Sequence, residues 1–247
     1  MSFDPLAGDY DRLRSGEGWR EITEHSLEAL RGATRLLDVG CGTGRFAVLA
    51  ADRLGCRTWA VDPSPAMLEQ ARARPGGGSV GWRRAVGERL PFRAGWFDAG
   101  HVHLVMHLVS DRSAVVSELA RVVAPSGRLA IVTFELDHFD EFHLTPYFPS
   151  IPAIDRARFP DPADLVAEVS AAGFHGVAAR RVSSVVEVPA EVALERARSR
   201  YISTLWEVDA VEYAAGIERL EHDVAAGRPA FQQRHEWCLI SARRGSR

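Results

Sequence analysis

The chain contains no lysine and no asparagine, and all 30 basic residues among its 247 are arginine. Without lysine, no Schiff base and no lysine general base can form, and a phosphate-binding loop that ends in Gly-Lys-Ser/Thr is excluded. Without asparagine, a site of the Asn-Pro-Pro-Tyr type for the amino group of a nucleic-acid base is excluded as well. The formal net charge of −3 provides no basic field that attracts nucleic acid. We therefore expect no nucleic-acid partner.

Cysteine and long apolar runs are also scarce. The three cysteines, Cys41, Cys56 and Cys238, are too few and too scattered for a disulfide framework or a zinc cluster. No apolar run approaches the roughly 18 residues that span a bilayer, and the N-terminal "MSFDPLAGDYDRLR" lacks the apolar stretch of a secretory signal. These absences predict a cytoplasmic protein with reduced thiols, no metal site and no membrane partner. We expect a monomer or a homodimer.

Short apolar runs alternate with helical spacing through the first half of the chain. The helices begin at good caps, such as Ser64 followed by Pro65, or Asp111. This alternation predicts an α/β protein with a doubly wound, mostly parallel sheet. The expected strands are 35–39, 56–62, 79–86, 95–107 and 128–135, and the expected helices are 17–31, 43–54, 64–74 and 111–123.

After Glu135 the alternation breaks. Residues 136–162 are rich in Phe, His and Pro without a clean period, which favours an active-site loop over a linker. A helix (163–172), a strand (177–188), two helices (190–207 and about 209–226) and a last strand (231–241) are expected beyond it. We expect one domain over 1–247, with a core at about 33–136, 160–188 and 229–242 and cap elements at about 1–30, 137–160 and 189–227.

Three glycines, Gly40, Gly42 and Gly44, follow the first expected strand, where ligands bind in open α/β sheets. Arg45 stands where a dinucleotide fingerprint needs its third glycine, so that fingerprint fails. Asp38, two residues before the glycines, repels a pyrophosphate and suits an ammonium group. Asp62 ends the second strand, where a carboxylate can bind both ribose hydroxyls. These residues predict a ribonucleoside ligand with a cationic tail and no phosphates.

With these features the chain resembles the class I S-adenosylmethionine (SAM) dependent methyltransferases, and most of all their small-molecule "type 11" branch. "LLDVGCGTG" (36–44) is similar to the family's first motif, and "AVDPSPAML" (60–68) to its second. "RAVGERLPFRAGWFDAGHVHLVMHLVSD" and "ELARVVAPSGRLAIVTFE" resemble later blocks. The resemblance covers about residues 35–136 and implies a Rossmann-like seven-stranded sheet, with an antiparallel last strand and a helical cap.

The resemblance implies SAM as the cofactor and S-adenosylhomocysteine as its product. It places Asp62 at the ribose and Met67 against the adenine. Val86 stands where many relatives carry an acid that binds the adenine amino group, so we expect backbone groups of Val86 and Gly87, with Glu88 nearby, to replace it. The cofactor contacts implied are Tyr10, Asp38, Gly40, Cys41, Gly42, Asp62, Pro63, Met67, Val86, Gly87, Glu88 and His103.

The expected reaction is an SN2 methyl transfer to oxygen, nitrogen or carbon of a small-molecule acceptor, with secondary metabolism as its setting. The rate comes chiefly from alignment. His107, His143 and Tyr147 are the candidate bases, and Glu135 and His138 further acceptor contacts. His101, His103 and His107 alternate along an expected strand and could share one face of it. A metal site built on them would have no suitably spaced carboxylate ligand. These histidines can instead lie in the core or in the wall of the cofactor site.

Two other functions fit the same sequence. One is an enzyme of this fold that uses the sulfonium electrostatically for a cyclisation or an elimination, without methyl transfer. The other is a non-catalytic protein that binds SAM. Label transfer from labelled SAM separates methyl transfer from the first. Absence of SAM binding with intact folding leaves only a nucleotide-sensing or scaffold protein with a vestigial site.

Overall fold

The strands of the sheet lie between Arg35 and Arg244 and alternate with helices. The structure is a computed structural model that describes residues 4–14 and 18–245. The strands are β1 (Arg35–Val39), β2 (Arg57–Asp62), β3 (Val80–Arg84), β4 (Phe97–His103), β5 (Val123–Phe134), β6 (Phe174–Pro189) and β7 (Ala230–Arg244). They form one seven-stranded sheet in the order β3-β2-β1-β4-β5-β7-β6. Only β7 runs antiparallel to its neighbours, which confirms the predicted fold.

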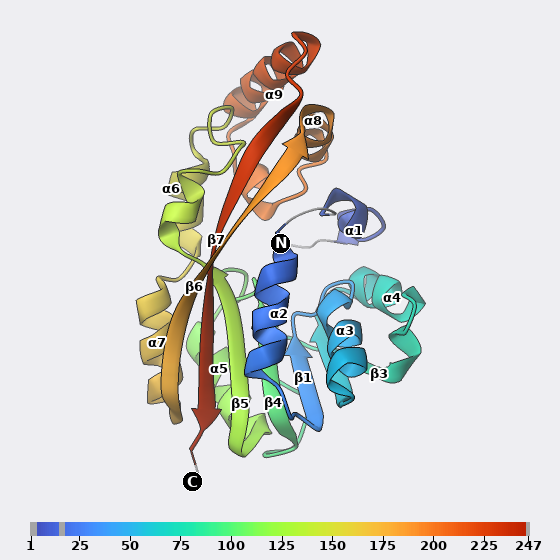
Figure 1. Ribbon diagram of the computed structural model, residues 1–247, viewed down its shortest axis with the longest axis vertical. Coiled ribbons are helices and arrows are strands. Elements are labelled where there is room, and N and C mark those ends of the chain that lie inside the picture. Colours follow the sequence, from blue (N-terminus) through green and yellow to red (C-terminus); the bar gives the residue numbers. More distant parts are fainter. Residues whose placement is uncertain (1–3, 15–17, 246–247) are drawn as a thin grey trace.

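Helices cover both faces of this sheet (Figure 1). Leu36 and Leu37 are neighbours on β1, yet they pack into different hydrophobic clusters because successive side chains point to opposite faces. On one face lie α2 (Trp19–Ala29) and α3 (Arg45–Leu54), and on the other α5 (Arg112–Val122) and α7 (Pro162–Ala171). The remaining helical elements are η1 (Asp4–Leu6), α1 (Tyr10–Leu13), α4 (Pro65–Ala73), η2 (Gly77–Ser79), η3 (Leu136–Phe139), α6 (Ile151–Arg158), α8 (Ala190–Arg198), η4 (Ser203–Trp206) and α9 (Ala210–Ala225).

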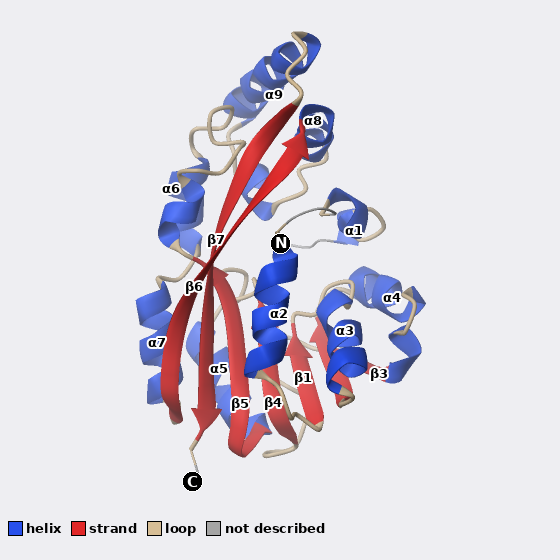
Figure 2. Cartoon of the chain, in the orientation of Figure 1, coloured by secondary structure: helices blue, strands red, loops and turns tan. Residues whose placement is uncertain are grey.

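β6 and β7 are much longer than the sheet needs. β5 pairs with β7 only up to Phe134↔Trp237, whereas β6 and β7 stay paired as far as Pro189↔Ala230. The excess forms a two-stranded arm that projects beyond the sheet and carries α8 and α9 near its tip (Figure 2). An isolated two-stranded arm is marginally stable in water, so it needs apolar cover. A cap core provides it, with Tyr147, Phe148, Ile151, Val188, Leu205, Leu220 and Phe231 among its buried side chains.

Local sequence signals located most of these elements. The strand predicted at 35–39 is confirmed, and the two predicted caps work as expected: the Met67 N–H donates to Ser64 Oγ at 3.0 Å and the Ala114 N–H to Asp111 Oδ1 at 3.0 Å. The predicted helix 190–207 is wrong beyond Arg198. Arg200 has a φ of +46°, which interrupts the helix before η4.

Two further differences concern the cap. Residues 136–162 contain η3 and α6, which the missing period concealed. Helix α2 falls in a segment expected to be cap, yet it packs on α3, β5 and β7 and belongs to the sheet layer. Residues 1–3 and 15–17 of that same segment lie outside the described residues. β6 and β7 run through both sheet and cap, and the division into one domain stays a prediction. Among the described residues, no helix is both long and apolar enough to cross a membrane.

Gly216 tests how tightly α9 packs on the cap. Its Cβ, if present, lies 2.3 Å from Phe148 Cε1 and 2.7 Å from the Tyr147 carbonyl oxygen. Alanine normally stabilises a helix over glycine by about 1 kcal/mol. We predict that Gly216→Ala instead lowers the free energy of unfolding by about 1–3 kcal/mol, because the clash involves backbone. Urea denaturation measures this. Ala214→Gly, on the exposed side of the same helix, is the control for propensity alone, and a stabilised Gly216→Ala variant contradicts the packing.

Candidate functional site

A cavity of about 680 Å³ opens at the carboxyl ends of β1, β2 and β4, under the cap. The chain reverses its strand order between β1 and β4, and open α/β sheets bind ligands at such a switch point. All residues predicted to contact the cofactor line this one cavity: Tyr10, Asp38, Gly40, Cys41, Gly42, Asp62, Pro63, Met67, Val86, Gly87, Glu88 and His103. The structure thus brings these residues together, and their contacts with a cofactor stay a prediction.

Glycine is required at the three positions of the first loop for different geometric reasons. All have positive φ, at +71° for Gly40, +53° for Gly42 and +77° for Gly44. A Cβ on Gly40 lies 2.2 Å from Val105 Cγ2, and one on Gly44 lies 2.4 Å from the Trp82 ring. These two glycines therefore allow the loop to pack against the protein. A Cβ on Gly42 meets nothing within 4 Å, so Gly42 leaves free space in the cavity.

Asp62 ties the ends of β1 and β2 together. Its Oδ2 accepts a hydrogen bond from the Gly42 N–H at 2.8 Å, and its Oδ1 accepts one from the Ser64 N–H at 2.9 Å. Burial raises the pKa of Asp62, and the two N–H groups partly oppose this rise. Burial also raises the pKa of the Cys41 thiol, with further increases from Asp38 and Asp62, so Cys41 is no thiolate nucleophile.

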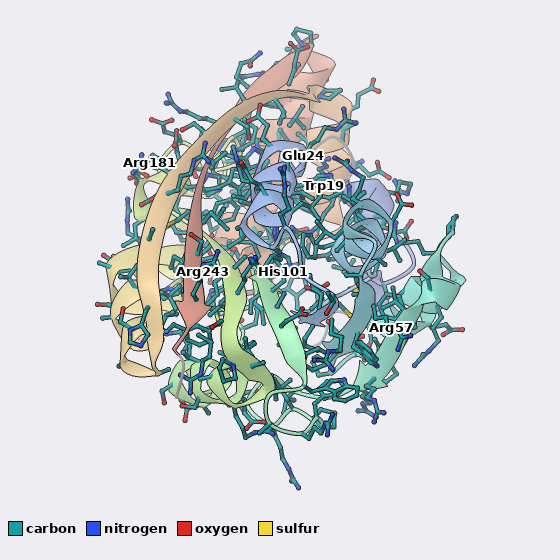
Figure 3. The ribbon with its side chains drawn as sticks, turned by 60° about the horizontal axis from the view of Figure 1, so that its bottom comes forward. Trp19, Glu24, Arg57, His101, Arg181 and Arg243 are labelled. Atoms are coloured by element: carbon teal, nitrogen blue, oxygen red, sulfur yellow. The ribbon has the colours of Figure 1, made fainter. Side chains whose placement is uncertain are left out.

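Asp38 is held by His101, for which the sequence allows roles as a metal ligand, a core residue or part of the cofactor wall. His101 is the register neighbour of Asp38 on β4, and its Nδ1 lies 2.8 Å from Asp38 Oδ1. Both side chains are buried, and the His101 ring stacks on Phe46 in the interior of the molecule (Figure 3). The other oxygen, Asp38 Oδ2, is buried without a hydrogen-bond partner among the described residues. A buried carboxylate oxygen in this state favours a ligand that donates hydrogen bonds.

The N-terminal segment closes over the glycine loop. Asp11 accepts a hydrogen bond from Thr43 Oγ1 at 2.7 Å and pairs with Arg74, whose Nε donates to the Thr43 carbonyl at 2.8 Å. Asp4 accepts a hydrogen bond from the Ser64 hydroxyl. These contacts bring Tyr10 into the lining of the cavity.

Glu88 is held by hydrogen bonds from the loop after β4. Its Oε1 accepts hydrogen bonds from the N–H and the hydroxyl of Ser110, both at 2.9 Å. Burial acts to raise the pKa of Glu88, but hydrogen bonds from backbone N–H groups and from Ser110 lower it overall. Val86, which follows β3, is 47% exposed, whereas Met67, which also lines the cavity, is buried.

The other half of the cavity is lined by rings, and we call it the aromatic chamber. His107 stacks on Phe159 with 3.8 Å between ring centroids, and Phe134 stacks on His138 at 3.9 Å. The planes of His235 and Trp237 lie 13° apart. The chamber consists of His103, His107, Phe134, His138, Phe139, Phe142, Phe159, Tyr201, His235 and Trp237. Within residues 4–14 and 18–245, no three His, Cys, Asp or Glu side chains converge in a way that could hold a metal ion.

The imidazoles of the chamber are neutral at physiological pH. Burial lowers the pKa of His103, His107 and His138 to about 3 and that of His235 to about 4. Nearby cationic and imidazole groups, among them Arg14 beside His103, His107 and His235, add to the decrease. Because the Glu236 N–H donates to His138 Nδ1 at 3.4 Å, the His138 proton resides on Nε2.

Of the three predicted bases, only His107 lines the cavity. His143 is buried in the cap, where its Nδ1 donates to Gln233 Oε1 at 2.5 Å. Tyr147 packs in the cap core, and its hydroxyl donates to Asp223 at 2.5 Å. Both side chains point into the cap because the loop after η3 turns into its core. The structure therefore does not bring them into the cavity lining, and their role as bases stays a prediction. Glu135 lies outside the lining and pairs with Arg181 at 3.6 Å.

The structure also adds residues that the sequence did not reveal. Asp155, Phe159, Ser203 and Thr204 line the cavity from the cap. Asp155 and Phe159 lie in the segment without a clean period, and Ser203 and Thr204 lie in an expected helix that carries no motif, so no local signal marked them. His235 and Trp237 enter the chamber from β7, where alternation along the strand is the one available signal.

Comparisons with known proteins agree with this geometry. A family model described as a methyltransferase domain matches residues 37–131. The demethylmenaquinone methyltransferase of Mycolicibacterium vanbaalenii is 30% identical over 209 residues, which are 73% of this chain and 88% of the relative. The chain spans about half the length, 48%, of uncharacterized mycobacterial relatives that are 35% identical to it.

Solved structures share the fold at lower identity. A protein from an antibiotic biosynthesis pathway of Anabaena variabilis has a TM-score of 0.71 at 20% identity, over 90% of this chain and 96% of that chain. A [4+2]-cyclase has a TM-score of 0.63 at 18% identity, over 98% of this chain and 94% of its own. At these identities the likeness concerns the fold alone.

The buried imidazoles predict a strong pH dependence of stability. In the unfolded chain a histidine titrates near pH 6.5, whereas in the fold these groups titrate at about 3 to 4. Between these values the unfolded state binds more protons, so stability is complete above pH 6.5 and falls as the pH decreases. Each histidine contributes a slope of up to about 1.4 kcal/mol per pH unit.

Denaturant unfolding between pH 7.5 and 5 measures this slope. We predict that His138→Phe, which keeps a ring in the stack, flattens the slope by about one histidine's share. His175→Gln, at an exposed position, serves as the control and leaves the slope as in the wild type. A wild-type stability that does not change between pH 7 and 5 contradicts the neutral chamber.

Proposed function

We propose that this chain transfers a methyl group from SAM to a small-molecule acceptor. The chain belongs to the class I SAM-dependent methyltransferase family. The observation that carries this proposal is the continuity of the cavity. One cavity joins the loop around Gly42, with the acids Asp38 and Asp62, to the aromatic chamber. A cofactor in the first half and an acceptor in the second therefore share one enclosed space.

The cofactor half fits SAM in three respects. Asp38 Oδ2 is a buried acceptor without a partner among the described residues, which suits the ammonium group of the methionine end. The open space at Gly42 lets a ligand approach the backbone. Asp62, which the sequence analysis assigned to the ribose, lies at the carboxyl end of β2 in the same lining. We infer that these residues, with Met67 and the Val86–Glu88 loop, bind the cofactor.

SAM supplies an activated methyl group on a sulfonium. The chain's own residues then need to exclude water and align the acceptor in line with that group. The chamber suits this task because its rings are apolar and its imidazoles are uncharged. We propose that His107 orients the acceptor through a hydrogen bond, as its stack on Phe159 fixes the ring plane. Its pKa of about 3 makes it a weak base, so alignment is the larger contribution.

The two alternative functions inferred from the sequence differ from methyl transfer in whether SAM is consumed. The fold also occurs in a [4+2]-cyclase, so a cyclisation or an elimination without methyl transfer is the second candidate. A non-catalytic protein that binds SAM is the third. A cytoplasmic location, secondary metabolism as the setting, and a monomer or homodimer stay predictions.

Gly42 tests the cofactor half. We predict that Gly42→Ala weakens SAM binding at least tenfold, because its Cβ occupies the open space at the loop. The matched control is Gly55→Ala: Gly55 has a similar φ of +61° and nothing within 4 Å of its Cβ, but lies at the end of α3 away from the cavity. Both variants bear the same backbone strain, of about 1 kcal/mol. Calorimetric titration with SAM compares them, and equal affinities in the two variants remove Gly42 from the cofactor site.

Methyl transfer itself is tested with methyl-labelled SAM and a panel of small hydroxylated aromatic compounds. We predict label in the acceptor together with stoichiometric S-adenosylhomocysteine. We further predict that His107→Phe lowers kcat/KM for the acceptor by about 10- to 100-fold and leaves SAM affinity unchanged, with His175→Gln as the surface control.

The outcomes discriminate the candidate functions. Product formation with SAM unchanged supports the cyclisation or elimination. SAM binding with no turnover of any compound supports the non-catalytic protein. Absence of SAM binding in a folded protein rejects all three functions.

A further inference from the structure

Asp155 brings a carboxylate into the lining of the cavity on the side of the aromatic chamber. It lies on α6 and is only 5% exposed. The other acids in the cavity lining are Asp4, Asp38, Asp62 and Glu88, and all of them belong to the cofactor half. Neither the glycine loop nor the expected base chemistry uses Asp155, so this buried acid requires its own explanation.

Arg158 holds Asp155 in place from outside the lining. Its Nη2 donates to Asp155 Oδ1 at 2.6 Å and to Thr204 Oγ1 at 3.0 Å, and its Nη1 donates to Ser203 Oγ at 3.3 Å. Thr204 in turn donates to Asp155 Oδ1 at 2.7 Å. Asp155, Ser203 and Thr204 all line the cavity and are 3–5% exposed. Together they form a rigid polar surface between α6 and η4, which we call the polar platform.

The hydrogen bonds of the platform converge on one oxygen of Asp155. Oδ1 receives both donors, whereas Oδ2 accepts no hydrogen bond from any described residue. A carboxylate oxygen enclosed with a ligand costs free energy unless the ligand donates to it. Arg158 already balances the charge of Asp155, so a cationic group gains little there. An anionic group faces an unpaired carboxylate oxygen. A neutral donor, such as a hydroxyl, fits best.

The rings of the chamber add a shape requirement. The planes of Phe134 and His138 lie 14° apart, those of Phe134 and Trp237 27° apart, and those of His235 and Trp237 13° apart. Near-parallel rings of this kind favour a flat aromatic ligand that stacks against them. The neutral imidazoles impose no charge on that ligand.

We propose that the polar platform is a specificity subsite for a neutral, planar aromatic acceptor, whose hydroxyl donates a hydrogen bond to Asp155 Oδ2 while its ring lies against Phe134 and Trp237. This inference rests on the proposed function, because it names the chemical class of that reaction's acceptor. Asp155 therefore selects acceptors that carry a hydroxyl group at the end that contacts the platform.

Binding of two matched probes tests the subsite without any need for turnover. 2-Naphthol and 2-methoxynaphthalene share one planar ring system, but only the first donates a hydrogen bond. We expect the wild type to bind 2-naphthol about 10- to 100-fold more tightly in calorimetric titrations. In Asp155→Asn the amide oxygen keeps the contact with Arg158, and an NH2 group replaces the accepting oxygen. The preference then falls below about threefold.

The control variant is Asp140→Asn. Asp140 pairs with Arg156 of the same helix α6, but both side chains are exposed and lie outside the lining, so the preference stays as in the wild type. A preference that Asp155→Asn leaves unchanged overturns the subsite, even where both affinities fall together. If Asp155→Asn does not fold, the wild type alone decides: 2-naphthoate or 2-(aminomethyl)naphthalene binding more tightly than 2-naphthol overturns the proposal, and the reverse order supports it.

The titrations are run with and without S-adenosylhomocysteine, which separates this inference from the proposed function. Asp155-dependent binding of 2-naphthol by a protein that binds no S-adenosylhomocysteine keeps the subsite and removes the methyltransferase proposal. Methyl transfer from SAM without selection for the hydroxyl removes only the subsite.

Discussion

The carboxylate of Asp62 joins the two loops that form the cofactor half of the cavity. It receives the N–H of Gly42 from the loop after β1 and the N–H of Ser64 from the start of α4. These two hydrogen bonds fix the distance between the glycine loop and the start of α4. Without that fixed distance, the glycine loop and the cap of α4 would not form one binding surface. Asp38, one strand away, then keeps a buried oxygen available because His101 occupies its other one.

The aromatic chamber depends on a different constraint, which is the length of β6 and β7. The part of β6 and β7 that extends beyond β5 carries the cap. His235 and Trp237 lie on β7 where it leaves its pairing with β5, and both line the cavity. Enclosure by the cap removes water from the imidazoles, and this burial is the largest cause of their lowered pKa values. The same arm therefore determines both the space for an acceptor and the neutral state of the imidazoles around it.

Prediction succeeded where the determining interaction is local in sequence. The apolar runs of β1 and β2, the caps at Ser64 and Asp111, and the glycine loop are each specified within about ten residues. It failed where a segment takes its structure from distant partners. α6 has no clear period of its own because it packs between η3 and η4, and His143 turned away from the cavity because Gln233, on β7, binds it.

The sequence by itself therefore determined the order of strands and helices from β1 to β5, the family resemblance and the group of residues at the carboxyl ends of β1 and β2. These follow from periodicity and from glycines and acids that are close in the chain. Only the tertiary structure decided which histidines reach the cavity, that Asp38 pairs with His101, and that Arg158 and Thr204 both bind one oxygen of Asp155. Each of these depends on side chains more than 45 residues apart that meet only after the sheet and its arm have formed.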